Sequence, residues 1–555
     1  LLTFFPLGNL LVRGTAVGSN PLNQLGTMLM CSLPDALKAA RHGEQCGSVV
    51  EVNSKRLLAL NLRKLAGEEL EFTPRSYILT KDNQSNEFNS FVKDFKASQA
   101  FAVLKCVSKM ELPKPCTCCN ATTALPKFPN ASSEGIYGRE IPELTWLPGP
   151  DPKQPITGEC VQVAIDFAEH AIPLLRNGAK LASLTVDDFE WDVLHRFSSD
   201  ACHCLADLSV YAAKARQLIG CLTSECQLEL LKNNVWILKP SMNGGGNGRG
   251  ILLMDRLPAS PEHLLSWAAA VGRGGVGGVQ DALDGCLLQK LVEEPHLLNQ
   301  EQLETCQVES ACRVQLDGVS DAIEQQNPQL LSEDSQNDGG QSFEKAGVIV
   351  SPDAGLKLRP ALFKYNFRLW ILASMASPPA VYVYRDSYID LAAREFTSEL
   401  DTASHVTNLQ RGHRMTQRYW PIPLFASHLQ CINDGHDLYH DCLYPQARMI
   451  ICKVFEALQA SPKSLLDKAT ARLKRLGVDL LVDSNYHVWL MEFNVLRNEY
   501  GLKAARGQDA KTHLAKRLLE EEVKLKSALT TGSMIPETWD NLSRCMAPKC
   551  GSPPV

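Results

Sequence analysis

Hydrophobic and polar residues alternate most clearly near the C-terminal end, where two apolar runs between Asp479 and Asn494 flank Ser484-Asn485-Tyr486. This pattern predicts two strands joined by a turn, and folding about the turn brings Asp479 opposite Glu492. Glu492 and Asn494 are two positions apart, so they share one face of their strand. Two carboxylates and an amide at the end of a buried sheet favour a hard divalent cation, because burying their charge is otherwise costly. The alternative is a hairpin with solvated edge charges.

Apolar runs elsewhere predict further ordered segments. Strands are expected at 235–238, 251–254 and 287–292, and ordered apolar segments at 101–107, 363–374 and 381–384. Helical spacing is found near 160–175, 201–218 and 508–527, the last with Leu514, Leu518 and Leu519 on one side. The mixture predicts an α/β protein.

The composition is ordinary for a globular protein, with 45% hydrophobic and 21% charged residues in 555. That length predicts about two to four domains. A net charge of −6 argues against a generally basic nucleic-acid binder. No apolar run reaches the roughly 20 residues that span a bilayer, so no membrane partner is expected. The acidic, Gln- and Asn-rich segment 301–346 predicts a disordered insertion.

The chain starts with Leu, which predicts a fragment, and its apolar N-terminus lacks the basic region of a signal peptide. Nineteen cysteines are scattered along it, which favours reduced intracellular thiols over a disulfide framework. A structural zinc joining Cys116, Cys118 and Cys119 to Cys202-His203-Cys204 is an alternative that the irregular spacing does not favour.

A glycine-rich loop lies between two predicted strands. Lys239 stands at the end of the first strand, and five glycines between 244 and 250 surround Arg249 before the second strand begins. Glycines let backbone N–H groups approach phosphates, and the two cations add positive charge. A cover of this kind with a distant carboxylate hairpin fits an ATP-grasp ligase, with the nucleotide between two lobes and Mg²⁺ bridging its phosphates. The alternative is a mobile hairpin loop.

The chain resembles the tubulin tyrosine ligase-like family in six segments, which follow one another in the family's order. They are Asn53–Leu65, Val235–Ile251, Cys286–Leu298, Phe363–Trp370, His405–Asn408 and the hairpin at Asp479–Asn494. Phe72–Leu79 and Tyr384–Asn408 look most like the tubulin monoglycylase branch. The resemblance implies an ATP-grasp fold with a small N-terminal domain (1–75), a central lobe with the phosphate loop (76–298), an acidic insertion (299–358), a C-terminal lobe with the magnesium site (359–530) and a tail (531–555).

The resemblance also implies roles for individual residues. Phosphates would be neutralised by Lys55, Lys239, Arg249 and Lys364, with Gly250 in the phosphate loop, and Thr407 and Asn408 would belong to the nucleotide site. Adenine would lie beside Gln289 and the backbone of Lys290 and Leu291, and Mg²⁺ would be held by Asp479, Glu492 and Asn494. Arg368, with Asn366, would stabilise the acyl-phosphate oxygens, because a planar guanidinium pairs well with phosphoryl groups.

For three of these residues a structural role is also open. Arg368 could be a surface strand residue, Gln289 an ordinary edge-strand side chain, and His405 a core histidine instead of a catalytic one.

Three departures from the family pattern bear on activity. Asn366 replaces an aspartate, Asp390 replaces an arginine that holds a substrate carboxylate in the family, and Val495-Leu496-Arg497 replaces Ser-Ser-Pro. A carboxylate near Asp390 would be repelled.

The implied reaction is ATP-dependent attachment of free glycine to glutamate side chains of the tubulin tail through an acyl phosphate. The implied setting is a cytoplasmic monomer on microtubules, including those of cilia or axonemes. The alternatives are a glutamate or tyrosine ligase of the same family, or a nucleotide-binding pseudoenzyme that docks on microtubules. An acidic acceptor predicts a basic face, with candidates Arg411, His413, Arg414, Arg418 and the helix-like run Lys463, Lys468, Arg472, Lys474, Arg475.

Overall fold

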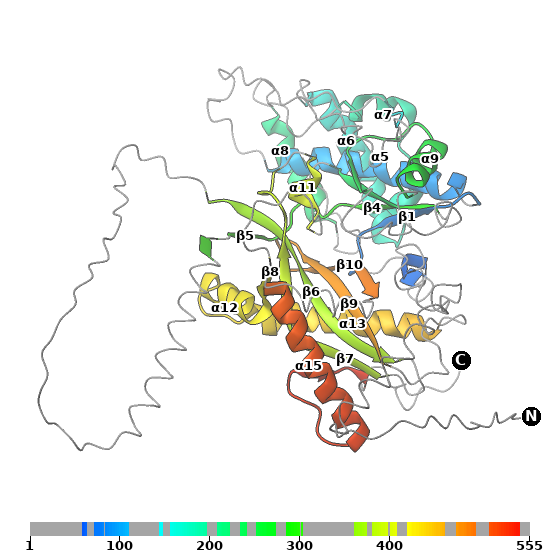
Figure 1. Ribbon diagram of the computed structural model, residues 1–555. Helices are drawn as coiled ribbons and strands as arrows, with labels where there is room; N and C mark the ends of the chain where they lie inside the picture. Colours follow the sequence, from blue (N-terminus) through cyan, green and yellow to red (C-terminus); the bar gives the residue numbers. More distant parts are fainter. Residues whose placement is uncertain are drawn as a thin grey trace, which may run out of the picture.

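The computed structural model shows two lobes, each built around its own β-sheet, with the smaller sheet above the larger one in Figure 1. Four strands form the small sheet in the order β1-β4-β2-β3, and seven form the large sheet. The structure describes residues 58–60, 62–63, 71–82, 84–109, 144–147, 156–196, 208–222, 234–240, 251–272, 285–299, 301–302, 360–374, 380–397, 400–407, 419–460, 473–495 and 510–543.

The large sheet runs β10-β9-β6-β7-β11, with β5 added to β6 and β8 added to β7. Every strand pair in the described part of the chain is antiparallel. The strands are β1 (Ser76–Leu79), β2 (Trp236–Pro240), β3 (Leu252–Met254), β4 (Cys286–Lys290), β5 (Leu297–Asn299), β6 (Leu362–Ser374), β7 (Ala380–Leu391), β8 (Tyr419–Pro421), β9 (Lys474–Val482), β10 (Val488–Val495) and β11 (Trp539–Asn541).

The helices of the described residues cover both sheets. The small-sheet lobe carries α5 (Gln84–Ser108), α6 (Gly158–Arg176), the short 3₁₀ turn η2 (Leu181–Ser183), α7 (Asp188–Leu194), α8 (Ser209–Gly220) and α9 (Pro261–Gly272). The large-sheet lobe carries α11 (Thr402–His405), α12 (Ile422–Ile432), the π-helical turn η6 (Tyr439–Leu443), α13 (Tyr444–Ala460) and α15 (Ala510–Thr531).

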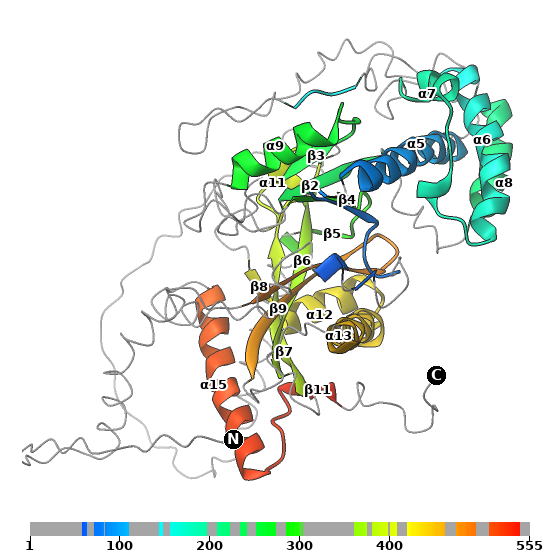
Figure 2. The same ribbon diagram turned by 90° about the vertical axis from the view of Figure 1, so that its right-hand side faces the viewer.

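The long helix α5 joins two cores of the upper lobe. Phe91 and Phe95 near its start pack on Trp236 and the rest of one face of the small sheet. Val103 and Val107 near its end pack into a separate helical layer with α6 and α8, which extends away from the large sheet in Figure 2. The apolar residues of α5 therefore pack against the small sheet near its start and against the helical layer near its end.

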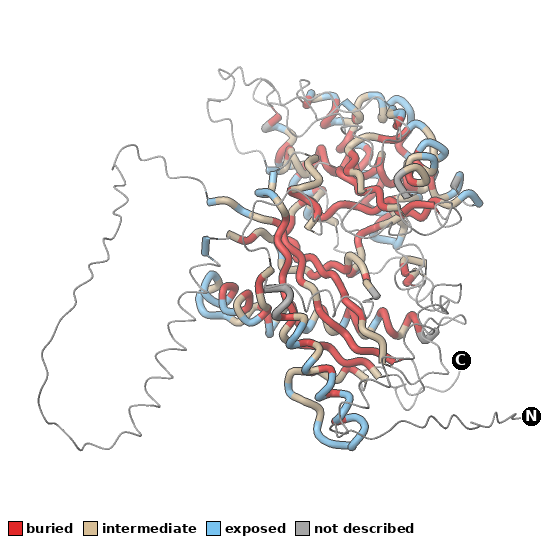
Figure 3. The backbone as a smooth tube through the Cα atoms, in the orientation of Figure 1, coloured by how far each residue is buried: buried red, intermediate tan, exposed pale blue. Residues whose placement is uncertain are grey.

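The large sheet is covered on both faces. Odd-numbered β6 residues such as Tyr365 and Phe367 pack with α12, α13 and β9 in the main core. At the lower end of the opposite face, Trp370 and Leu372 pack against leucines of α15, and Figure 2 shows α15 on the other side of the strands from α13. The buried strands form the continuous red region of Figure 3. The upper part of the α15 face carries polar side chains.

The segment 291–299 connects the two lobes. Pro295 bridges to Asp483, the His296 amide donates to the Val482 carbonyl at 2.9 Å, and the last residues form β5 on β6. Lys105 and Lys109 at the end of α5 both form ion pairs with Glu294, at 3.2 and 3.0 Å. These contacts fix the small sheet relative to the large one.

The strands predicted at 235–238 and 251–254 are confirmed as an antiparallel pair, and the predicted hairpin is β9 and β10. The helix-like interpretation of Lys474 and Arg475 is wrong. Both lie in β9, because Leu476, Val478 and Leu480 alternate into the main core, and Arg475 is ion-paired with Glu522 of α15. The remaining members of both predicted basic groups lie outside the described residues, as do the insertion from 303 onward and both cysteine clusters.

Among the helices that the structure describes, none combines the length and the apolarity that crossing a lipid bilayer requires.

Candidate functional site

A row of polar side chains crosses the upper part of the large sheet on its α15 face. Glu492 of β10 is opposite Asp479 of β9, and Asp479 is opposite Arg368 of β6. Arg368 donates through Nε and Nη2 to both oxygens of Asp479, and Asn494 Nδ2 donates to Asp479 Oδ2 and Glu492 Oε1 at 3.0 Å each. The predicted pairing of Asp479 with Glu492 is confirmed. The alternative of solvated edge charges is wrong for Asp479, which is only 4% exposed.

A β-bulge in β10 sets the direction of this row. The register shifts between Leu490, which pairs with Leu480, and Glu492, which pairs with Asp479, so Met491 is the extra residue. Leu490 packs in the main core on the α13 face. In a regular strand Glu492 would share that face, because side chains repeat every second residue. The bulge therefore turns Glu492 and Asn494 toward Asp479 and Arg368.

Burial dominates the electrostatics of the row. It raises the pKa of Asp479 to about 6, and the neighbouring Glu492 carboxylate adds to the rise while Arg368 opposes it. A second cation near the two carboxylates would favour their ionised forms.

The donor chemistry of the row fits Mg²⁺. Asp479, Glu492 and Asn494 offer only oxygen ligands once the Asn494 amide turns its Oδ1 toward the carboxylates, and Mg²⁺ is usually held by one or two carboxylates together with substrate phosphates and water. In the described part of the chain, no group of three or more His, Cys, Asp or Glu side chains is gathered as a metal centre.

Two buried lysines from different lobes lie near each other, and one of them is on the strand of Arg368. Lys239, at the end of β2, donates to Gln289 Oε1 of β4 at 2.6 Å, and Lys364 lies on β6, on the same face as Arg368. The edge-strand interpretation of Gln289 is wrong, because β4 lies between β1 and β2 and Gln289 is 5% exposed. The surface interpretation of Arg368 is also wrong, since its side chain is 16% exposed and paired.

Lys364 carries an electrostatic cost in the ligand-free fold. Burial lowers its pKa from 10.5 to about 7, and the charge of Lys239 contributes. Among the described residues, no carboxylate is ion-paired with Lys364. An anion bound between the two lobes would relieve this cost, because it would face both lysines.

We expect the Lys364→Met substitution to stabilise the ligand-free protein in a pH-dependent way. The folded chain holds the Lys364 proton only up to about pH 7, whereas the unfolded chain holds it to about pH 10.5. Wild-type stability therefore rises with pH across that window, and the full cost, on the order of 5 kcal/mol, is present below it. Urea unfolding at both ends of the window should show the advantage of the variant only at the acidic end. An equal difference at both ends would contradict the assignment.

Asn366 and Asp390 form a buried cross-strand pair between β6 and β7. They are 6% and 7% exposed, and the Asn366 Oδ1 atom has no hydrogen-bond partner among the described residues. Asn366 shares the face of Lys364 and Arg368 because the three alternate along β6. A carboxylate and an amide oxygen are thus buried beside the candidate phosphate-binding residues.

The strand end predicted to hold adenine lies between two small apolar clusters. Leu291 packs with Ile237 on the small sheet, while the next residue, Val292, packs with Trp489 on the large sheet. The amides of Lys290 and Leu291 already donate to the carbonyls of Arg75 and Val235, at 2.8 and 3.1 Å. A base bound here would therefore use the Gln289 side chain and the backbone carbonyls.

The Lys290 side chain lies on the other face of the small sheet from Gln289, over the Trp236 ring. It is fully buried with Glu293 and the Val235 carbonyl, where burial lowers its pKa to about 8.

His405 ends α11 as a buried residue packed on Phe396, at 5.0 Å between ring centroids, which fits the core interpretation. Thr407 lies two residues further on and is half-buried. The predicted site residues Lys55, Arg249, Gly250 and Asn408 lie outside the described residues, as do Leu496 and Arg497.

Comparison with known proteins bears on this geometry. Residues 359–496 match the model of the tubulin-tyrosine ligase family. This match covers β6, β7, β9 and β10, the strands that carry the polar row. The chain contains a tubulin-tyrosine ligase family domain.

The relatives of this domain include glycylases. The chain is 20% identical to the protein monoglycylase TTLL8 of Mus musculus over 479 residues, which cover 81% of this chain and 46% of that protein. It is 28% identical to the tubulin monoglycylase TTLL3 of Mus musculus over 24% of this chain and 16% of that protein, and 24% identical to tubulin glycylase 3A of Drosophila melanogaster over 24% and 14%. At most, the chain spans about half the length of these relatives.

One residue of the ligase-family domain was not predicted from the sequence. Tyr388 of β7 is opposite Arg368 and only 1% exposed, so it extends the polar row by one strand. The available signal was its position two residues before Asp390, which puts both side chains on one face of β7.

Proposed function

We propose that this chain is an ATP-dependent ligase that attaches glycine to a glutamate side chain in the C-terminal tail of tubulin. The observation that carries the proposal is the polar row of Arg368, Asp479 and Glu492 close to the buried lysine pair Lys239 and Lys364. Carboxylates for a hard cation and lysines for phosphates are what phosphoryl transfer between two lobes requires. The two α/β lobes with antiparallel sheets and the names of the relatives support the same reaction class.

The first step would transfer the γ-phosphoryl group of ATP. One oxygen of the acceptor carboxylate attacks the γ-phosphorus, the bond to ADP breaks, and an acyl phosphate forms. Lys239 and Lys364 would hold the phosphates, and Arg368 would stabilise the transferring oxygens through its planar guanidinium. Asp479, Glu492 and Asn494 would hold Mg²⁺, whose charge offsets the negative charge that develops during transfer.

The second step would form the amide. The uncharged amino group of glycine attacks the acyl carbon, phosphate leaves, and the nitrogen loses a proton. The lysines would retain the departing phosphate until the product leaves, because it faces the same buried cations. The proposed acceptor places the protein on microtubules.

The deciding test is incorporation of labelled amino acids into microtubules with ATP and Mg²⁺, run in parallel with glycine, glutamate and tyrosine. Incorporation of glycine alone supports the proposal, and incorporation of another label names a different donor within the same family. A second candidate is a nucleotide-binding pseudoenzyme, which the buried pair of Asn366 and Asp390 favours because it changes the site beside Arg368. ATP binding without incorporation of any label would select it.

We expect the Asp390→Arg substitution to shift donor choice toward glutamate. Asp390 is buried on the face of the reacting residues, so its negative charge should exclude a second donor carboxylate, which arginine would attract. The ratio of glutamate to glycine incorporation should rise about tenfold.

The smaller change Asp390→Asn, which keeps the side-chain shape, should raise the ratio of glutamate to glycine incorporation less. The ratio should therefore increase from aspartate to asparagine to arginine, in the order of their charge. An unchanged ratio in both variants would remove Asp390 from donor selection.

A further inference from the structure

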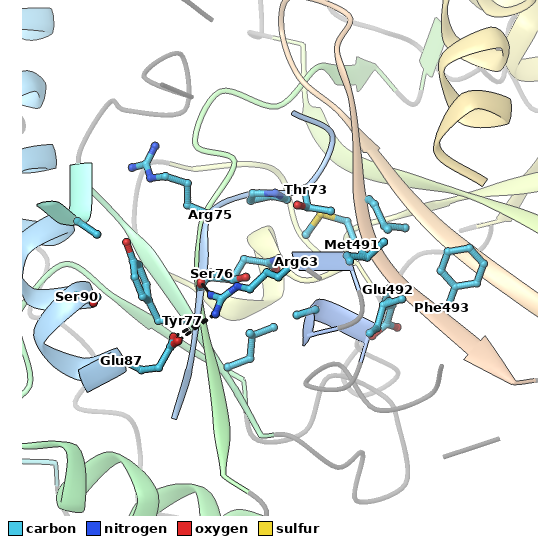
Figure 4. A pocket seen from close by; sticks show the side chains of 18 of the residues that line it. Arg63, Thr73, Arg75, Ser76, Tyr77, Glu87, Ser90, Met491, Glu492 and Phe493 are labelled. Atoms are coloured by element: carbon cyan, nitrogen blue, oxygen red, sulfur yellow. Dashed lines mark hydrogen bonds and ion pairs between the residues drawn. The ribbon is translucent and has the colours of Figure 1, made fainter. Parts of the chain in front are cut away.

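A pocket of about 290 Å³ opens between the two lobes. Its walls come from residues 58, 59, 62 and 63, residues 73–77, the first turns of α5, residues 180 and 182, β4, and the bulged part of β10. Figure 4 shows Arg63 near its middle, with Glu87 on one side and Glu492 on the other.

Two cations are close together in this lining. Arg63 is ion-paired with Glu87 at 3.1 Å and also donates to the Ser76 carbonyl. Lys180 is half-exposed, and its pKa is lowered by burial and by the charge of Arg63. Arg75 also lines the pocket, but it is held in a buried ion pair with Asp94 at 2.9 Å. Positive charges gathered around a cavity attract an anion, because its walls focus their field.

The pocket adjoins the polar row at Glu492. Glu492, proposed above as a metal ligand, forms part of its wall, and Gln289 forms another part. Neither Lys239 nor Lys364 is among its described lining residues. The described lining of the pocket therefore does not include the lysines suited to the nucleotide phosphates. An anion in the pocket would lie next to Glu492 and, through it, next to the proposed metal.

We propose that this pocket receives the acceptor, as a glutamate side chain of an acidic peptide. This inference rests on the proposed function and assigns the acceptor to residues of its site. Leu58, Leu62 and Met491 would contact the methylene groups of that side chain, Lys180 and Arg63 would attract its carboxylate, and the chain would point toward Glu492. Glu87 would compete with the acceptor for Arg63, because a carboxylate already occupies that guanidinium.

The direct test is binding of a fluorescein-labelled oligoglutamate peptide, followed by fluorescence anisotropy with a non-hydrolysable ATP analogue and Mg²⁺ present. The Lys180→Glu variant should bind the peptide about tenfold more weakly, because one attractive charge becomes repulsive. The control Lys516→Glu makes the same charge change on an exposed position of α15 and should bind like wild type. Binding of the ATP analogue should be the same in all three proteins.

A second variant changes binding in the opposite direction. Glu87→Gln removes the carboxylate that competes for Arg63 and keeps an oxygen that can accept from the Ile78 amide, as Glu87 now does at 3.0 Å. It should bind the oligoglutamate peptide a few-fold more tightly.

Three results would overturn the inference. They are no peptide binding by wild type, no change in either variant, or equal loss of peptide and ATP-analogue binding in Lys180→Glu, which would assign the pocket to the nucleotide. Lys180-dependent peptide binding without incorporation of any amino acid would leave the acceptor site standing and reject the ligase activity.

Discussion

The Glu492→Gln variant is expected to fold normally and to lose at least about a hundredfold in amino-acid incorporation. Glutamine keeps the size of the side chain and an oxygen that can accept from Asn494 Nδ2, as Glu492 now does at 3.0 Å. It removes one of the two negative charges that would hold Mg²⁺, so the metal and the phosphates it neutralises would be held loosely. The incorporation assay measures turnover, and a thermal melt verifies folding.

A control and a metal titration make this prediction specific. Glu456→Gln makes the same change at a partly exposed position of α13, ion-paired with Lys453 and outside the polar row, and should keep full activity. Raising the Mg²⁺ concentration should restore part of the activity of Glu492→Gln, because the defect is weaker metal binding. Wild-type activity in Glu492→Gln would reject the metal assignment.

The Arg368→Met variant is expected to lose about 3 kcal/mol of unfolding free energy, because it leaves the Asp479 carboxylate buried without its cation. Asp479 is 4% exposed, and Arg368 contacts both of its oxygens. Adding Asp479→Asn should recover most of that stability, since the uncompensated charge is then gone, but it should not recover incorporation. Urea unfolding of the two single variants and the double variant measures the coupling between the residues.

A second arginine separates stability from activity. Arg475 lies on the neighbouring strand β9 and forms a comparable ion pair with Glu522 of α15 at 2.5 Å, outside the polar row. Arg475→Met should lose stability and still incorporate amino acid at a temperature where it is folded. Purely additive effects of Arg368→Met and Asp479→Asn on stability would contradict the ion pair as the source of the loss.

The sequence was most informative where neighbouring residues decide the structure. The turn at 484–486 and the alternation on both sides of it were enough to pair Asp479 with Glu492. They did not reveal the bulge at Met491, because an extra residue leaves the composition of a strand unchanged. The mixed α/β class followed from the same local patterns, and the family resemblance is confirmed by the match to residues 359–496.

Features that depend on distant partners were missed or misread. Helix α5 has no single apolar stripe, because Phe91 faces the small sheet while Val103 faces the helical layer. The edge-strand alternative for Gln289 stayed open because nothing local indicates that β1 pairs with the other side of β4. Arg63 and Lys180 are far apart in sequence and follow no pattern, so their meeting in one pocket required the fold.

The bulge of β10 also restricts how this protein can change over evolutionary time. Point substitutions at Met491 keep the strand length, and any side chain of moderate size could occupy the extra position. Loss of Met491 would restore a regular strand and leave Glu492 opposite Asp479, because Glu492 would then directly follow Leu490 and face the other side of the sheet. Loss of Phe493 would instead make Asn494 directly follow Glu492 and turn its side chain toward the main core, although every proposed ligand would still be present in the sequence. Descendants of this chain should therefore tolerate loss of the bulged residue far better than a change in length between Glu492 and Asn494.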